Sequence, residues 1–150
     1  MTEILFYHLN GQTPEQVLPA LLQKSLERGW RVVVQASSEE RVEALDAHLW
    51  TWRDDAFLPH AVWRDGEASA QPILLTAGGE NPNGAVVRFL VDGAAMPANA
   101  SAYQRVVVLF DGADSDAVVA ARVRWSEAKS AGFEVTYWQA DEKGGWRRQA

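Results

Sequence analysis

Acidic and imidazole side chains in two segments of this chain could take part in acid–base or metal chemistry. Asp111 follows the apolar run RVVVLF, and α/β enzymes often place catalytic acids at the carboxyl end of such a strand. Asp54, Asp55 and His60 lie close together in the segment LWTWRDDAFLPHAV at 49–62. If both groups converged in one concave pocket, the protein would be a small α/β hydrolase or metal-dependent enzyme.

Each of these residues also has an ordinary structural role. Asp111 opens the stretch DGADSD, where Asp and Gly suit a turn and an aspartate can cap the following helix. His60 has no second histidine at a metal-ligand spacing. The sequence contains no cysteine, no G-x-S-x-G elbow and no glycine-rich phosphate loop. We therefore favour a protein without catalytic residues, metal or cofactor, and keep the enzyme as the alternative.

The most informative pattern lies in a predicted helix over 113–132. At about 100° per residue, four residues fall on one stripe: Val118, Arg122, Trp125 and Lys129. A neighbouring face carries small residues that allow close packing on a sheet: Ala117, Ala120, Ala121, Ala128 and Ala131. We expect the alanine face to be buried and the stripe to face solvent. Two cations beside an indole suit an acidic peptide that ends in a hydrophobic residue; a solvated face with an isolated tryptophan is the other interpretation.

The order of the elements predicts an α/β fold. Apolar runs indicate strands at 3–9, 30–36, 73–77, 85–93, 105–112 and 133–139, and periodic patterns indicate helices at 14–29, 39–50 and 113–132. This alternation is typical of a Rossmann-like three-layer α/β/α architecture with a mostly parallel sheet and at least one antiparallel strand. No repeat or linker divides the chain, so we expect a single domain over 1–150. Its polar, glycine-rich end, 139–150, is predicted to be a loosely ordered tail.

Composition argues for protein partners. The chain has 150 residues and a formal net charge of −6, from 20 acidic residues against 14 Lys and Arg. Because phosphate contacts dominate nucleic-acid affinity, this charge opposes DNA binding as the main task. Binding through Arg147, Arg148 and the late helix stays a third interpretation. Seven tryptophans favour a protein interface, where this residue is enriched.

The sequence also carries expectations about location. No run approaches the roughly 18 apolar residues of a membrane span. The N-terminal stretch MTEILFYHLN has no basic region ahead of its apolar residues, unlike a signal peptide. Together with the absence of cysteine, these features predict a cytoplasmic protein.

Four separated segments resemble, in order, the chi subunit of bacterial DNA polymerase III: LDAHLWTWRDDAFLPHAV, PILLT with NPNGA, RVVVLFDG, and RVRWSEAKSAGFEVTYW. The first is similar to the L-W-x-x-x-x-x-F-x-P-H stretch of that family. The resemblance implies an α/β fold and a non-catalytic accessory subunit of a DNA-directed DNA polymerase (nucleotidyltransferase) holoenzyme. Such a subunit is attached to the clamp loader in DNA replication and contacts DNA only indirectly.

The resemblance further implies two protein contacts. The psi subunit of the clamp loader, or a helicase on the same surface, would bind residues that match the first segment: Trp50, Trp52, Phe57, Pro59 and His60. The acidic C-terminal tail of single-stranded-DNA-binding protein would bind the late helix at Val118, Arg122, Trp125 and Lys129. Val118 stands where family members often have a cation, which leaves one charge fewer here. For the rings of Trp50 and Phe57, burial in the core is the alternative.

Overall fold

The computed structural model describes residues 2–51, 60–62, 72–78, 84–97, 99–140 and 146–149. Within these residues, eight strands form one sheet in the order β3-β4-β2-β5-β6-β1-β7-β8. The strands are β1 (Glu3–Leu9), β2 (Val32–Gln35), β3 (His60–Val62), β4 (Ile73–Thr76), β5 (Val87–Leu90), β6 (Arg105–Asp111), β7 (Glu134–Ala140) and β8 (Trp146–Arg148). The helices are α1 (Pro14–Glu27), α2 (Glu39–Trp50) and α3 (Ser115–Ser130), with a short 3-10 turn η3 (Ala100–Ala102).

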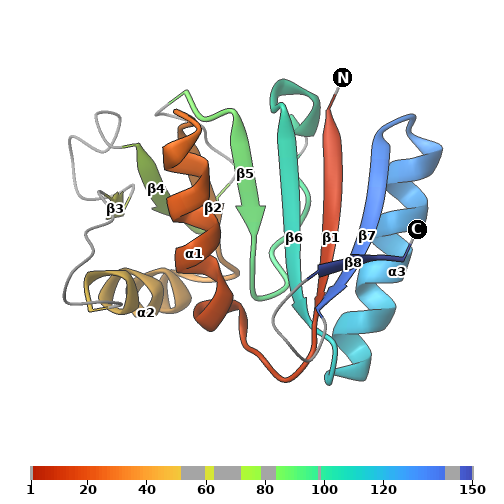
Figure 1. Cartoon of the computed structure of the whole chain (residues 1–150), viewed down its shortest axis with the longest axis horizontal. Coiled ribbons are helices and arrows are strands. Elements are labelled where there is room, and N and C mark those ends of the chain that lie inside the picture. Colours follow the sequence, from red (N-terminus) through yellow and green to blue (C-terminus); the bar gives the residue numbers. More distant parts are fainter. Residues whose placement is uncertain are drawn as a thin grey trace.

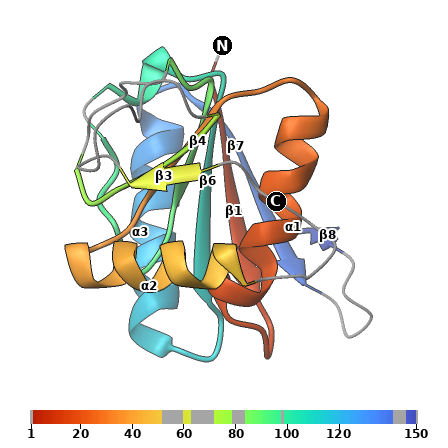
Figure 2. The ribbon, with the colours of Figure 1, turned by 90° about the vertical axis from the view of Figure 1, so that its left-hand side faces the viewer.

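The sheet separates two layers of helices. The apolar residues of α1 and α2 pack against one face of the sheet and those of α3 against the other, an arrangement that Figures 1 and 2 show from two sides. All neighbouring strands are parallel except β7 and β8. The prediction of a Rossmann-like α/β fold with a mostly parallel sheet and an antiparallel strand is confirmed.

Local capping signals explain where the first two helices begin. The Thr13 hydroxyl accepts a hydrogen bond from the backbone N–H of Gln16, whose side-chain oxygen accepts one from the Thr13 N–H. This capping box, with Pro14 at the first helical position, satisfies N–H groups that the helix itself leaves unpaired. Ser38 caps α2 in the same way, accepting from the N–H of Arg41.

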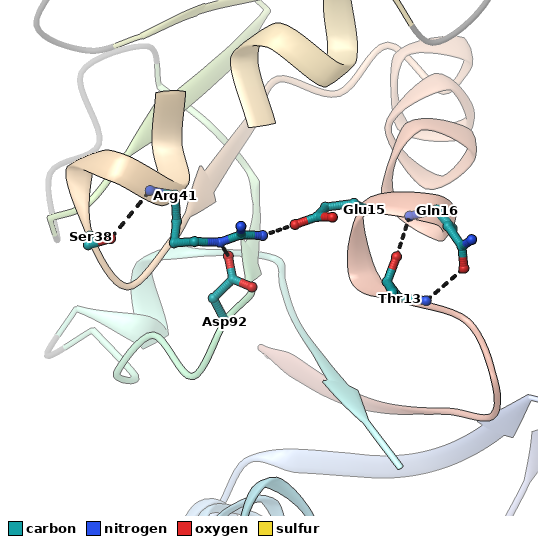
Figure 3. A network of polar contacts seen from close by, with 6 residues as sticks. All are labelled: Thr13, Glu15, Gln16, Ser38, Arg41 and Asp92. Carbon is teal, nitrogen blue, oxygen red and sulfur yellow. Dashed lines mark hydrogen bonds and ion pairs between the residues drawn. The ribbon is translucent and has the colours of Figure 1, made fainter. Parts of the chain in front are cut away.

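Arg41 ties the two helices to the sheet. Its guanidinium pairs with Glu15 on α1 and, at 3.1 Å, with the carboxylate of Asp92 after β5 (Figure 3). Asp92 adopts the left-handed conformation (φ 55°), which aspartate tolerates better than most residues. The network fixes the loop that follows β5 against both helix starts.

Apolar strands form the core, with one charged exception. β2, β4 and β5 are buried at every position, as expected for parallel strands covered on both faces. Arg88 lies within β5 and is wholly buried. It donates to Gln35 (3.0 Å from Nε and 2.6 Å from Nη2), to the Tyr103 hydroxyl (2.9 Å) and to the carbonyl of Gly78.

The end of the chain differs from the expectation. Gln139 and Ala140 belong to β7, and Trp146–Arg148 form β8, antiparallel to β7. The prediction of a loosely ordered tail over 139–150 is wrong for these residues. The physical reason is a tertiary contact: the Trp146 ring stacks on Tyr7 of β1 with centroids 4.5 Å apart.

Candidate functional site

α3 buries three of the five alanines that the sequence predicted to face the sheet, together with two larger residues. The helix residues that are buried or pack against the core are Ala117, Val118, Ala121, Trp125 and Ala128. Ala120 and Ala131 are exposed, so the predicted alanine face is wrong for these two. Val118 and Trp125 are half-buried and do not face solvent fully, whereas Arg122 and Lys129 are exposed. Val118 and Trp125 pack beside these alanines because burying part of a large apolar side chain is favourable.

A cavity of about 500 Å³ opens beside this face. The described residues that line it are His8, Arg122, Trp125, Ser126, Tyr137, Gln139 and Gln149. Of the four residues predicted from the helix pattern, Arg122 and Trp125 line the cavity. Lys129 lies next to it, with its ammonium 4.6 Å from the centroid of the Trp125 ring, while Val118 lines no part of it.

The sequence pattern did not indicate the other five lining residues, among them His8 and Tyr137. The Nδ1 atom of His8 lies 2.8 Å from the Tyr137 hydroxyl. Strand alternation indicates which residues share a face, but the parallel pairing of β1 with β7 brings together residues 129 positions apart. Nothing local in the sequence specifies that pairing.

The electrostatics of the cavity favour an anionic ligand with an apolar group. Burial lowers the pKa of His8, and the positive charge of Arg122 lowers it further. The negative charge of Asp111 raises this pKa by a smaller amount. Burial raises the pKa of Tyr137, which Arg122 partly offsets. At neutral pH both groups are therefore uncharged. Arg122 is then the charged group among the described lining residues, beside the ring of Trp125.

A second candidate surface lies at the end of α2. The side chain of Trp50 is 54% exposed, so core burial, the alternative for this ring, is wrong. The Trp50 ring covers His60 with centroids 4.5 Å apart, and the His60 Nε2 lies 3.1 Å from Asp46 Oδ1. His60 itself is buried and positions Trp50. Trp52, Phe57 and Pro59 lie outside the described residues.

The enzyme alternative loses its central pair of residues. Asp111 is the last residue of β6 and His60 the first residue of β3, so they lie at opposite ends of parallel strands. The two strands are also four strand spacings apart, or about 19 Å across the sheet. Asp111 Oδ1 instead accepts a hydrogen bond from the Ala113 N–H at 2.9 Å, which is a turn contact. Asp54 and Asp55 lie outside the described residues. Among the residues with a described position, no His, Cys, Asp and Glu side chains group as a metal site would require.

The helices give no sign of a membrane span. Within the described ranges, none is both long and apolar enough to cross a bilayer.

Comparisons with known proteins agree on one family. Residues 1–136 match the family model described as "DNA polymerase III chi subunit, HolC". The chain is 26% identical over 91 residues to the probable DNA polymerase III subunit chi of Rickettsia prowazekii, covering 61% of this chain and 55% of that protein. It is 33% identical over 82 residues to the DNA polymerase III subunit chi of Pseudomonas aeruginosa, covering 52% and 56%. The matched regions thus span a little over half the length of these two relatives.

Proposed function

The chain belongs to the DNA polymerase III chi subunit family, and we propose that it is a non-catalytic adaptor of the cytoplasmic replisome. It binds the acidic C-terminal tail of single-stranded-DNA-binding protein through the cavity beside α3. It binds the psi subunit of the clamp loader, or a helicase, through the surface around Trp50. Two moderate contacts on one scaffold give a much stronger link than either contact alone.

The cavity beside α3 carries the first half of this proposal. An acidic tail with a terminal aromatic residue needs a cation for a carboxylate and an apolar wall for the ring. Arg122 supplies the cation and Trp125 the wall. Lys129, held over the Trp125 ring, adds positive charge beside the entrance for the acidic residues that precede the tail's end.

The exposed ring of Trp50 supports the second half. A large aromatic side chain that is held in place and more than half exposed is a typical interface anchor. His60 and Asp46 hold it from below. Phe57 belongs to the same proposed surface by the resemblance of its segment.

Calorimetry with a synthetic acidic tail peptide tests the first contact. Arg122→Glu should weaken binding by about tenfold or more, because it replaces a charge-assisted contact with a repulsion. Lys24→Glu makes the same charge change on α1, on the other side of the sheet, and should leave affinity within about twofold. Unchanged affinity in Arg122→Glu would remove the assignment of this cavity.

A pull-down with the psi subunit tests the second contact. Trp50→Ala should reduce capture of psi while tail-peptide affinity stays normal. Val123→Ala removes a comparably exposed apolar side chain from α3 (53% exposed) and should have no effect. Loss of both contacts in Trp50→Ala would mean that the substitution had disrupted the domain.

A further inference from the structure

A second cavity lies on the other face of β1. Tyr7 and His8 are successive strand residues, so their side chains point to opposite faces of the sheet; His8 lines the cavity beside α3, and Tyr7 lines this one. The second cavity has a volume of about 160 Å³, and its charged and aromatic lining residues are Tyr7, Lys24, Arg28, Trp30, Arg105 and Trp146. In Figure 1 no described helix lies in front of β6 and β1, next to α1.

Three cations line this small cavity in a chain whose net charge is −6. The guanidiniums of Arg28 and Arg105 both lie over the Trp30 ring, 5.0 and 5.2 Å from its centroid. Arg105 forms a long ion pair with Glu3, with 3.6 Å between Nη2 and Oε2, and the Glu3 side chain is half-exposed. Within the described part of the chain, neither Arg28 nor Lys24 pairs with a carboxylate. Among the described residues, Lys24 and Arg28 therefore bring to the cavity positive charge that no carboxylate pairs with.

The aromatic lining adds a hydrogen-bond donor and a stacking surface. Tyr7 and Trp146 stack with centroids 4.5 Å apart and an angle of 23° between their planes. Burial raises the pKa of Tyr7, although the charges of Arg105 and Arg28 act in the opposite direction. The hydroxyl therefore stays protonated at neutral pH and can donate to an anion.

We propose that this cavity binds a phosphate of a single-stranded nucleic acid, with a neighbouring base against the Tyr7–Trp146 pair. Guanidiniums match the geometry of phosphate oxygens, and aromatic side chains within a basic groove are the usual means of holding single strands. The site is independent of both proposed protein contacts.

The size of the cavity favours a single strand over a free nucleotide as its ligand. Sites that enclose a whole small ligand measure about 300–1,000 Å³, whereas this one holds about 160 Å³. It has room for one phosphate and part of its sugar. The remaining nucleotides would lie on the open surface toward β8, where Arg147 and Arg148 are exposed. A polymer gains from such neighbouring contacts and a mononucleotide does not.

Fluorescence anisotropy with a labelled oligothymidylate of about 20 nucleotides at low salt tests the proposal. The full chain should bind it, and Arg28→Gln and Lys24→Gln should each weaken binding by about threefold to tenfold. Each should also make the dependence of log K on log salt shallower, by at most about 0.7, the value for the one phosphate contact that the cavity holds. Arg122→Gln removes the same charge on the opposite side of the sheet and is the matched control. Arg28 and Lys24 are exposed on α1 or at its end, and unchanged circular dichroism verifies folding.

Three outcomes would overturn the proposal. The first is no binding of the oligonucleotide by the wild-type chain at low salt. The second is equal loss in Arg28→Gln and Arg122→Gln, which would indicate general charge attraction. The third is displacement of the labelled oligonucleotide by thymidine monophosphate, inorganic phosphate or an acidic peptide at the concentration at which the unlabelled oligonucleotide displaces it. The cavity would then not be selective for a single strand.

Discussion

Gly112 shows how closely the chain packs where β6 passes into α3. Its N–H donates to the carbonyl oxygen of Leu9 at 2.8 Å. A Cβ atom at this position would overlap that oxygen and the ring of His8. Since a backbone atom cannot rotate away as a side chain can, the local strands would have to shift.

Gly112→Ala should therefore lower the free energy of unfolding by about 3 kcal/mol, at the upper end of typical overpacking costs. Gly132→Ala is the matched control: its Cβ would meet nothing within 4 Å, but its φ of +90° is unfavourable for alanine, which costs about 1 kcal/mol. Urea unfolding measures both. Equal losses would show that the contact of Gly112 with Leu9 is easily relieved.

His8 gives the stability of the domain a dependence on pH. Burial and Arg122 hold its pKa below the ordinary value of 6.5. Between the folded pKa and about 6.5 the unfolded chain binds more protons than the folded one. The stabilising contribution of neutral His8 to the free energy of unfolding is thus fully present above about pH 6.5. It is lost as the pH falls through the pKa of His8 in the folded protein.

Replacing His8 by Gln should remove this acid-side loss. The free energy of unfolding of the wild type should fall more steeply between pH 7.5 and 5 than that of His8→Gln, measured by urea titration at several pH values. Parallel profiles for the two proteins would contradict the depressed pKa.

Among the elements, β5 depends on one buried charge. Arg88 joins β5 to β2 through Gln35 and to the segment before β6 through Tyr103. Removing the guanidinium would leave the Gln35 oxygen and the Tyr103 hydroxyl without this donor in the core. A buried polar group without a hydrogen-bond partner lowers the stability of the folded protein.

Arg88→Met should lower the free energy of unfolding by about 3–5 kcal/mol, which for a domain of this size shifts Tm by about 10 °C or more. Arg105→Met, in the half-buried first position of β6, should cost about 1 kcal/mol or less. A scan by circular dichroism compares the two. Similar shifts would mean that water or a rearrangement replaces the contacts of Arg88.

The types of the elements were predictable because their signals are local. Thr13 and Pro14 mark the start of α1, and the apolar run at Arg105–Asp111 marks β6. The face that α3 buries was predictable only in part: three of its alanines pack on the sheet as expected, but the partial burial of Val118 and Trp125 depends on the strands beneath them. The buried network around Arg88 could have been predicted, because a charged residue within an apolar strand pattern indicates polar partners in the core.

At the scale of the whole molecule, the order of the strands sets the distance between the two proposed protein contacts. Trp50 covers the first residue of β3, at one edge of the sheet, whereas Tyr137 of β7 lines the cavity beside α3. Six strand spacings separate β3 from β7, or about 29 Å. That is roughly three times the screening length of about 10 Å at 0.1 M salt.

The two contacts should therefore be independent in energy. Calorimetric titration of the tail peptide into the complex with psi should give an affinity within about twofold of that for the chain alone, because no charge at one site reaches the other and the sheet between them is rigidly packed. By linkage, psi affinity should be equally insensitive to the peptide. Trp50→Ala, which should not bind psi, is the control: adding psi to this variant should leave its affinity for the tail peptide unchanged. A reciprocal change of fivefold or more would contradict independence and would require a change in the sheet that both partners sense.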